Sequence, residues 1–333
     1  MLYKLIIMIV IITNVLANSQ VSVIPQLTSF IAVGGGGKII QSQGSTWNNE
    51  SSGYMSSISS IVRSNNGIFV ATGIDAILTS KDGITWINNK TINSITLQSV
   101  SVNVQNKFVA VGYNGFIITS NDGINWSLTT QVTSTTLNGI TSGSNNNFIA
   151  VGNNGIILNS DDGSDWKIGS AVTNNILYGI TYNSNYNSSQ TPEYIAVGSG
   201  GTIITSIDGI NWKQQSSGTI QDIYSITVYN IPNQTIFLAV GSNGLVLYSN
   251  DGIKWSKVPS ITNQPLYSVA IDNQGNYVAV GGGGVIITST DGINWQLSNS
   301  GTTNQLYSIT TIAPIKPSLQ EKVLITYSYN KRA

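Results

Sequence analysis

The chain has 333 residues, only 8% of them charged, and its 14 basic and 14 acidic residues cancel. It therefore has no net charge to attract nucleic acid or an anionic membrane. Cys and His are absent, which excludes disulfides, metal or haem ligation by these residues, and catalysis by a Cys or His. We expect no cofactor. Many β-branched residues and 34 Gly favour an all-β protein.

Residues 1–17 have the pattern of a secretory signal peptide. Lys4 supplies a positive charge, an apolar run follows at 5–12, and Val15 and Ala17 occupy the −3 and −1 positions of a cleavage site. The run is shorter than the roughly 20 residues that a membrane-spanning helix needs. We therefore expect cleavage after Ala17, a secreted or extracellular protein with no membrane span, and a single domain at 18–333.

Export would make Asn-x-Ser/Thr sequences candidates for N-glycosylation. Five occur after residue 17, and four of them are candidate acceptors: Asn49, Asn89, Asn187 and Asn233. The fifth, Asn125, lies in a tight turn beside Trp126 and is the weakest acceptor.

One segment recurs seven times along the chain, and each copy ends in a Trp, at intervals of 39 to 46 residues. In the last copy we expect strands at 266–271, 277–280 and 285–289, a Gly-rich turn before the third strand, and a fourth strand from Trp295. Four antiparallel strands in about 40 residues is the size of one propeller blade. The sequence therefore predicts an all-β, seven-bladed β-propeller.

The turn between the third and fourth strands carries the motif Ser-x-Asp-Gly-x-x-Trp. Six copies are intact, with the acidic residues Asp82, Asp122, Asp162, Asp208, Asp251 and Asp291. The first copy has Gln41 and Gln43 in place of Ser and Asp. We expect the carboxylate to accept hydrogen bonds from turn amides and the Trp to pack on a neighbouring strand. The alternative is a row of Ca²⁺ or catalytic sites, but six turns on one rim cannot converge on one substrate.

This motif resembles the Asp-box, or BNR, repeat of sialidase-like propellers. Together with the Ala-Val-Gly strand ends, the chain is most similar to the photosystem II assembly and stability factor family. The resemblance implies a propeller that contacts its partner through a basic patch. With only two Arg, Arg63 and Arg332, this chain departs from that pattern.

Two further strand-like segments, 306–311 and 322–328, follow the seventh copy. They match the first and second strands of a blade, so we expect C-terminal strands to pair with the N-terminal module and close the ring. The segment 21–24 competes for the same first-strand position, and the strand-by-strand closure stays open.

The residue inventory argues against an enzyme. A sialidase resemblance would require three Arg around the substrate carboxylate, and only Arg63 lies in the body of the propeller. Other glycosidases need two carboxylates about 5 to 10 Å apart, and outside the Asp boxes no acidic pair recurs. The Gly runs at 34–37 and 281–284 are strand turns, with no helix after them to cradle phosphate.

One position of the first strand varies while its neighbours do not. It is occupied by Ser59, Gln98 and Asn138 in three consecutive copies, then by Tyr178, Tyr224, Tyr267 and Tyr307. In a propeller the first strand lines the central channel, so these side chains are expected at its mouth, on the rim opposite the Asp boxes. Such an aromatic arc suits a sugar or an apolar peptide side chain. The alternative is that the Tyr only pack between blades.

Two classes of function remain. The first is a secreted, non-enzymatic recognition module that binds a glycan or a protein ligand on one propeller face. The second is a structural or assembly scaffold without a discrete small ligand. The sequence identifies neither the ligand nor the oligomeric state.

Overall fold

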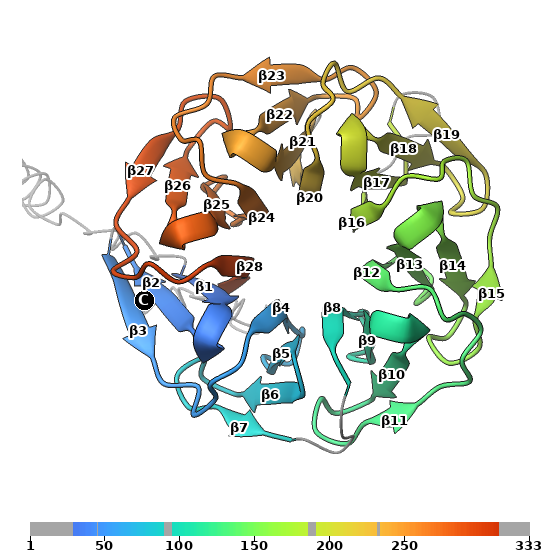
Figure 1. Ribbon diagram of the computed structural model, residues 1–333, viewed down its shortest axis with the longest axis horizontal. Helices are drawn as coiled ribbons and strands as arrows, with labels where there is room; N and C mark the ends of the chain where they lie inside the picture. Colours follow the sequence, from blue (N-terminus) through green and yellow to red (C-terminus); the bar gives the residue numbers. More distant parts are fainter. Residues whose placement is uncertain (1–28, 45, 90–94, 186–190, 232–233, 313–333) are drawn as a thin grey trace, which may run out of the picture.

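The computed structural model describes residues 29–44, 46–89, 95–185, 191–231 and 234–312, and in these ranges the chain forms a ring of seven four-stranded antiparallel sheets (Figure 1). The described residues contain no α-helix, only six short 3₁₀ turns. None of them lies in a helix long and apolar enough to cross a membrane. The all-β, seven-bladed propeller is confirmed.

The strands of each blade run from the channel to the periphery. Blade 1 is β28 (Leu306–Ile312), β1 (Ser29–Gly34), β2 (Ile39–Gln43) and β3 (Thr46–Glu50). Blade 2 is β4 (Ile58–Arg63), β5 (Phe69–Gly73), β6 (Ala76–Ser80) and β7 (Ile87–Asn88). Blade 3 is β8 (Leu97–Val102), β9 (Phe108–Gly112), β10 (Ile117–Ser120) and β11 (Ser127–Leu128). Blade 4 is β12 (Leu137–Ser142), β13 (Phe148–Gly152), β14 (Ile157–Ser160) and β15 (Lys167–Ile168).

The remaining three blades repeat this order. Blade 5 is β16 (Leu177–Tyr182), β17 (Tyr194–Gly198), β18 (Ile203–Ser206) and β19 (Trp212–Gln215). Blade 6 is β20 (Ile223–Ile231), β21 (Gln234–Gly241), β22 (Val246–Ser249) and β23 (Ser256–Val258). Blade 7 is β24 (Leu266–Ile271), β25 (Tyr277–Gly281), β26 (Ile286–Ser289) and β27 (Gln296–Ser298). The strands expected in blade 7 are present within one residue at each end.

The second and third strands of six blades are joined by a 3₁₀ turn with a positive φ at its centre. These turns are η1 (Gly35–Gly37), η2 (Tyr113–Gly115), η3 (Asn153–Gly155), η4 (Ser199–Gly201), η5 (Ser242–Gly244) and η6 (Gly282–Gly284). Blade 2 has a shorter turn, in which Asp75 takes the positive φ of 51°. Gly or Asn fills the central position of all six 3₁₀ turns, since both tolerate the left-handed conformation.

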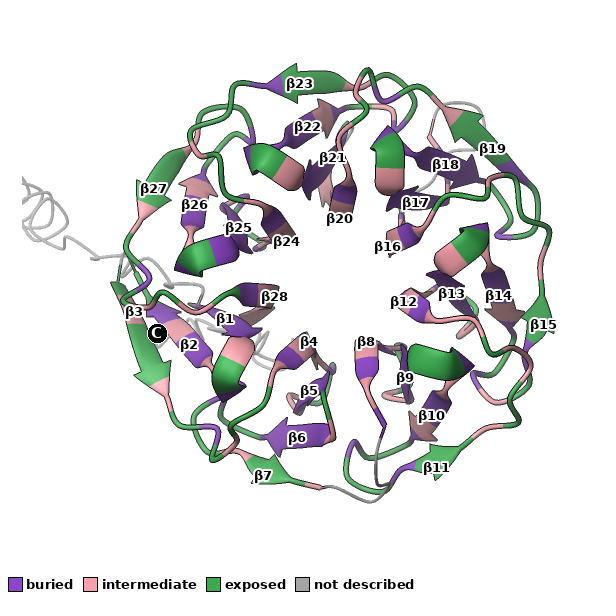
Figure 2. Cartoon of the chain, viewed as in Figure 1, coloured by how far each residue is buried: buried purple, intermediate pink, exposed green. Residues whose placement is uncertain are grey.

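The core lies between the blades. Each of seven apolar clusters joins the second and third strands of two adjacent blades, and the first and seventh blades are joined in the same way. Figure 2 shows these inner strands buried and the outermost strands largely exposed. Strands covered on both faces explain the continuous apolar runs of the repeat.

The ring is closed by the C-terminal strand. β28 supplies the innermost strand of blade 1 and pairs with β1 from Ser29↔Ile312 to Gly34↔Leu306. The predicted closure by C-terminal strands is therefore confirmed for 306–312. The segments 21–24 and 322–328, and the signal sequence expected at 1–17, lie outside the described residues.

Candidate functional site

The first strands of all seven blades line the central channel, and their starting residues surround one cavity (Figure 1). The cavity measures about 740 Å³. Every member of the variable column lines it: Ser59, Gln98, Asn138, Tyr178, Tyr224, Tyr267 and Tyr307. We call this cavity the channel mouth. The seven residues expected to converge on one rim of the channel do so.

Each residue of the column is the extra residue of a β-bulge. In blade 5, Leu177 pairs with Gly198 and Gly179 pairs with Val197, so Tyr178 has no partner on β17. The pairing skips Ser59, Gln98, Asn138, Tyr224, Tyr267 and Tyr307 in the same way. A bulge removes its residue from the ladder and redirects the side chain. A side chain at this position therefore has no partner on the second strand of its own blade, which explains why the position varies.

The four tyrosines form a continuous arc across blades 5, 6, 7 and 1. The ring centroids are 5.3 Å apart between Tyr178 and Tyr224, 5.7 Å between Tyr224 and Tyr267, and 5.5 Å between Tyr267 and Tyr307. All three pairs are tilted or edge-on, as aromatic rings prefer. All four side chains are half-buried, so each ring packs on its neighbours and also borders the cavity.

The other side of the channel mouth is built from amides and hydroxyls. The Asn138 amide donates to the side-chain oxygen of Asn153 (3.0 Å) and to the backbone oxygen of Leu177 (2.9 Å), which fixes its orientation. Asn153 and the half-exposed Tyr113 also line the cavity, and both come from 3₁₀ turns. Sequence reasoning missed these two because they precede the third strand, far along the chain from the column.

Three hydroxyls of the arc, those of Tyr178, Tyr224 and Tyr267, have a raised pKa and remain protonated at physiological pH. Burial, and to a smaller extent the nearby carboxylate of Asp222, raise the pKa of Tyr178 and Tyr224. Burial, with the Tyr307 hydroxyl, raises the pKa of Tyr267. The Tyr307 hydroxyl donates to the Gln305 side-chain oxygen at 2.7 Å. The hydroxyls of Tyr178, Tyr224 and Tyr267 are therefore neutral and can donate and accept hydrogen bonds.

The Asp boxes lie at the opposite end of the blades from the channel mouth. In blade 7, Leu266 pairs with Gly281 beside η6, whereas Ile271 pairs with Tyr277 and Tyr277 with Ser289 at the box. Antiparallel pairing thus places the strand starts and the boxes on different rims.

Hydrogen bonds within each turn account for the box residues. In blade 7 the Asp291 carboxylate accepts from the backbone N–H of Ile293 (2.8 Å) and Asn294 (2.7 Å). The Ser289 hydroxyl accepts from Gly292 N–H, and the Trp295 indole donates to Gly292 O. The other five boxes make the same bonds. Within the described ranges, no three acidic side chains gather as metal ligands.

The described candidate glycosylation sites and Arg63 do not gather at one place. Asn49 is exposed on β3, while the Asn89 side-chain amide donates to the Thr79 hydroxyl, and Asn187 and Asn233 lie outside the described residues. The Asn125 side-chain amide donates to the Asp122 carboxylate at 2.7 Å. Arg63 lies at the box end of β4, over the Phe69 ring at 5.4 Å.

The repeat, the fold and the channel can be compared with known proteins. The family model described as photosynthesis system II assembly factor YCF48 matches residues 59–316. The chain belongs to this family. No curated protein sequence matches it.

Solved structures share the propeller of this YCF48-family chain. YCF48 from Cyanidioschyzon merolae is 18% identical, with a TM-score of 0.55 over 74% of this chain and 86% of that one. A YCF48 solved bound to D1 peptide is 16% identical, with a TM-score of 0.59 over 79% and 92%. A Lactobacillus plantarum protein is 10% identical, with a TM-score of 0.63 over 86% and 99%. At these identities the likeness concerns the fold.

Proposed function

We propose that this protein is a non-enzymatic assembly scaffold that binds a peptide segment of a partner protein at the channel mouth. The observation that carries the proposal is the convergence of seven bulged side chains on one cavity of about 740 Å³. A bulge costs regular pairing, and bulges gather where a side chain is aimed at a site. Membership of a family of assembly factors, one of them solved with a bound peptide, supports the same class of partner.

The chemistry of the channel mouth suits a neutral or apolar peptide segment. Four tyrosine rings on one arc offer an apolar wall, and the amides of Gln98 and Asn138 lie on the other. In the part of the chain that the structure describes, no Lys, Arg, Asp or Glu lines the cavity. A peptide would place an apolar side chain against the tyrosines and pair its backbone with the amides and hydroxyls.

The test selects binders from a displayed library of random dodecapeptides on the full chain. We expect enriched peptides whose affinity falls at least about tenfold, or 1.4 kcal/mol, in the Tyr224→Ser/Tyr267→Ser variant. Ser occupies the same bulge in blade 2, so this variant should fold. The matched control, Tyr182→Ser/Tyr229→Ser, removes two tyrosines from the first strands β16 and β20 outside the channel mouth and should bind as the wild type does.

Two results would overturn the proposal. If the enriched peptides bind the Tyr224→Ser/Tyr267→Ser variant with the same affinity as the wild type, the peptide site is not at the channel mouth. Tyr-dependent capture of neutral glycans on an array, with no enriched peptide, would give the mouth a carbohydrate ligand instead.

A further inference from the structure

The third-to-fourth strand turn of blade 1 is one residue shorter than the other six. β2 and β3 pair from Ile39↔Glu50 to Gln43↔Thr46, which leaves a turn of two residues. In blade 5, by contrast, pairing stops at Ser206↔Trp212 and the five residues between them form the box. Ser42, and not Gln41 as the sequence motif suggested, takes the place of the box Ser, because it pairs with Trp47 as Ser206 pairs with Trp212. The segment between Ser42 and Trp47 is one residue shorter than in the intact boxes and holds no Asp to accept the turn amides.

The shortened turn gives Trp47 a new partner. In the six intact boxes the indole N–H donates to the box Gly of its own turn at 3.0 to 3.3 Å. The Trp47 indole donates instead to the Ser298 hydroxyl of blade 7, at 3.2 Å. The indole therefore bonds across the junction between the last and first blades instead of within its own turn.

The shortened turn also uncovers part of blade 7. In the other blades the buried box Gly lies against the second strand of the preceding blade. A Cβ added to Gly83 would lie 2.6 Å from Ile31, and one added to Gly292 would lie 3.2 Å from Leu238. The residue of blade 7 that corresponds to Ile31 and Leu238 is Val278, and Gly44 is exposed. Val278 and Gly44 instead line a cavity of about 600 Å³, the seam pocket.

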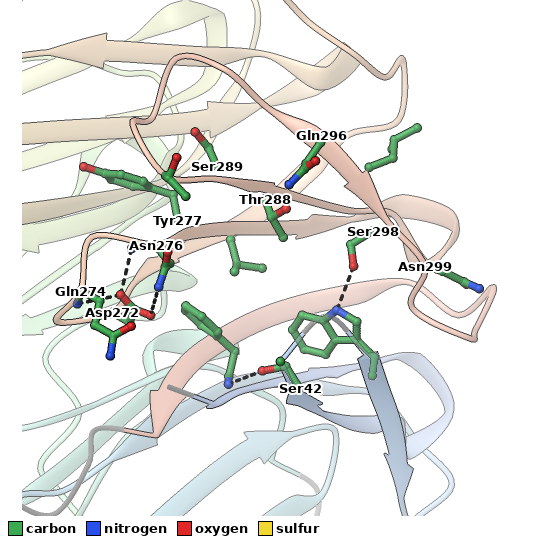
Figure 3. Close-up of a pocket in the computed structure, with 16 residues that line it drawn as sticks. Ser42, Asp272, Gln274, Asn276, Tyr277, Thr288, Ser289, Gln296, Ser298 and Asn299 are labelled. Carbon is green, nitrogen blue, oxygen red and sulfur yellow. Dashed lines mark hydrogen bonds between the residues drawn. The ribbon is translucent and has the colours of Figure 1, made fainter. Parts of the chain in front are cut away.

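Figure 3 shows Ser298 on one side of the seam pocket and the Asp272 loop on the other. The Ser298 hydroxyl accepts the indole N–H of Trp47, which also lines the pocket. Phe30 and Tyr277 are buried at its wall, and Gln274, Asn276, Gln296 and Asn299 supply amides. Further hydroxyls come from Ser42, Thr288, Ser289, Thr290 and Ser298.

The charges of the seam pocket narrow the ligand class. Among the described residues no Lys or Arg lines the pocket, which disfavours phosphate, sulfate and carboxylate ligands. Asp272 is the one acidic residue among the described residues that line the pocket, and it is only 2% exposed. Its carboxylate accepts hydrogen bonds from the backbone N–H of Gln274 (2.9 Å) and of Asn276 (2.8 Å), and from the Asn276 side-chain amide (2.8 Å). The carboxylate thus holds its own loop in place, and the groups left to a ligand are neutral.

We propose that the seam pocket binds a neutral pyranose sugar. The C–H face of a pyranose packs on an indole, and its hydroxyls pair with amides and hydroxyls of the kinds that line this pocket. The volume lies within the range of small-ligand sites, about 300 to 1,000 Å³, and holds one or two sugar rings. This site is separate from the channel mouth and does not depend on the proposed function.

The test titrates the full chain with the methyl glycosides of glucose, galactose, mannose and N-acetylglucosamine at millimolar concentration. The readout is the ¹H–¹⁵N signal of the Trp47 indole, identified by its loss in Trp47→Phe. We expect at least one of these sugars to shift this signal and sialyllactose not to.

Rebuilding the box provides the decisive variant. Insertion of one Asp between Gln43 and Gly44 gives Ser42 the spacing Ser-x-Asp-Gly-x-x-Trp of the other six blades, so the turn should widen, cover Val278 and weaken sugar binding at least about tenfold. Ser298→Ala removes the hydroxyl that accepts the Trp47 indole N–H and leaves the turn sequence unchanged. It should also weaken sugar binding. Two controls, Trp255→Phe at an intact box and Tyr224→Ser/Tyr267→Ser at the channel mouth, should bind sugar as the wild type does.

Two results would overturn the seam-pocket proposal. One is the absence of any shift of the Trp47 signal with all four neutral glycosides. The other is sugar binding that is unchanged both in the variant with the inserted Asp and in Ser298→Ala, or that is lost only in the channel-mouth variant.

Discussion

At the scale of single residues, hydrogen bonding decides which side chains repeat and which vary. The box Asp repeats because its carboxylate oxygen accepts two backbone N–H groups that the turn leaves unpaired, as Asp82 does for Ile84 and Thr85. The bulged position varies because no cross-strand neighbour constrains it, so Ser59 and Tyr178 occupy equivalent places. The variable position is therefore free to serve recognition.

The box carboxylates predict a loss of stability in acid. The backbone N–H groups of Thr85 and Ile84 lower the pKa of Asp82 to about 2. At Asp122 and Asp208, burial raises the pKa, but hydrogen bonds from Asn125 and Asn211 outweigh it and leave the pKa at about 2. An unfolded Asp has a pKa of about 3.9.

The sign of the effect follows from these values. The carboxylates contribute their full stabilisation above about pH 4 and lose it as the pH falls toward 2, because protons then bind the unfolded chain more tightly. We expect Tm, measured by circular dichroism, to fall across this window. Asp82→Asn/Asp122→Asn/Asp208→Asn keeps an acceptor oxygen but cannot titrate, so its Tm should fall less. An equal fall in both proteins would contradict this account.

At the scale of elements, the two kinds of turn do different work. The 3₁₀ turns shape the channel mouth, since η2 and η3 contribute Tyr113 and Asn153 to it. The box turns fasten each blade to the preceding one, as Gly83 does against Ile31. Where the box is lost, in blade 1, a pocket opens at the same place.

Gly244 and Gly301 have the same φ of 68° but differ in the space around them, so they separate the cost of a left-handed backbone from the cost of a steric clash. A Cβ on Gly244, at the end of η5, would lie 2.0 Å from the backbone oxygen of Thr262, whereas one on Gly301 would meet nothing within 4 Å. We expect Gly301→Ala to lower the free energy of unfolding by about 1 kcal/mol through the left-handed conformation alone. Gly244→Ala must also displace backbone and should cost at least about 3 kcal/mol. Urea denaturation measures both, and equal losses would refute the role of the close contact.

At the scale of the whole molecule, the ring depends on one non-local pairing. β28 completes blade 1 from the far end of the chain, and Leu306 and Ile309 are buried against Val280 and Ile286 of blade 7. Without β28, the apolar strand β1 would become an exposed edge on the channel side.

Paired truncations test the closure. A chain that ends after Gln305 lacks β28, whereas one that ends after Ile312 retains it. We expect the shorter chain to lose its cooperative thermal transition and to aggregate in size-exclusion chromatography, relative to the longer one. Similar Tm values for the two truncations would show that β28 does not lock the ring.

The repeat alone predicted most of this architecture. Seven copies with alternating apolar strands, Gly-rich turns and an Asp box leave few other folds, since each module can bury its apolar faces only against the next. The variable column was also visible in the sequence, and its place at the channel mouth follows from blade geometry.

Only the tertiary structure decided the rest. The bulges at the variable column depend on the pairing between strands. Tyr113 and Asn153 line the channel mouth because the fold brings their turns beside the column. The seam pocket exists because Trp47 and Ser298, 251 residues apart, become neighbours only when the ring closes. A local motif specifies a hairpin through its own hydrogen bonds, whereas a cavity depends on which distant surfaces meet and on what is missing between them.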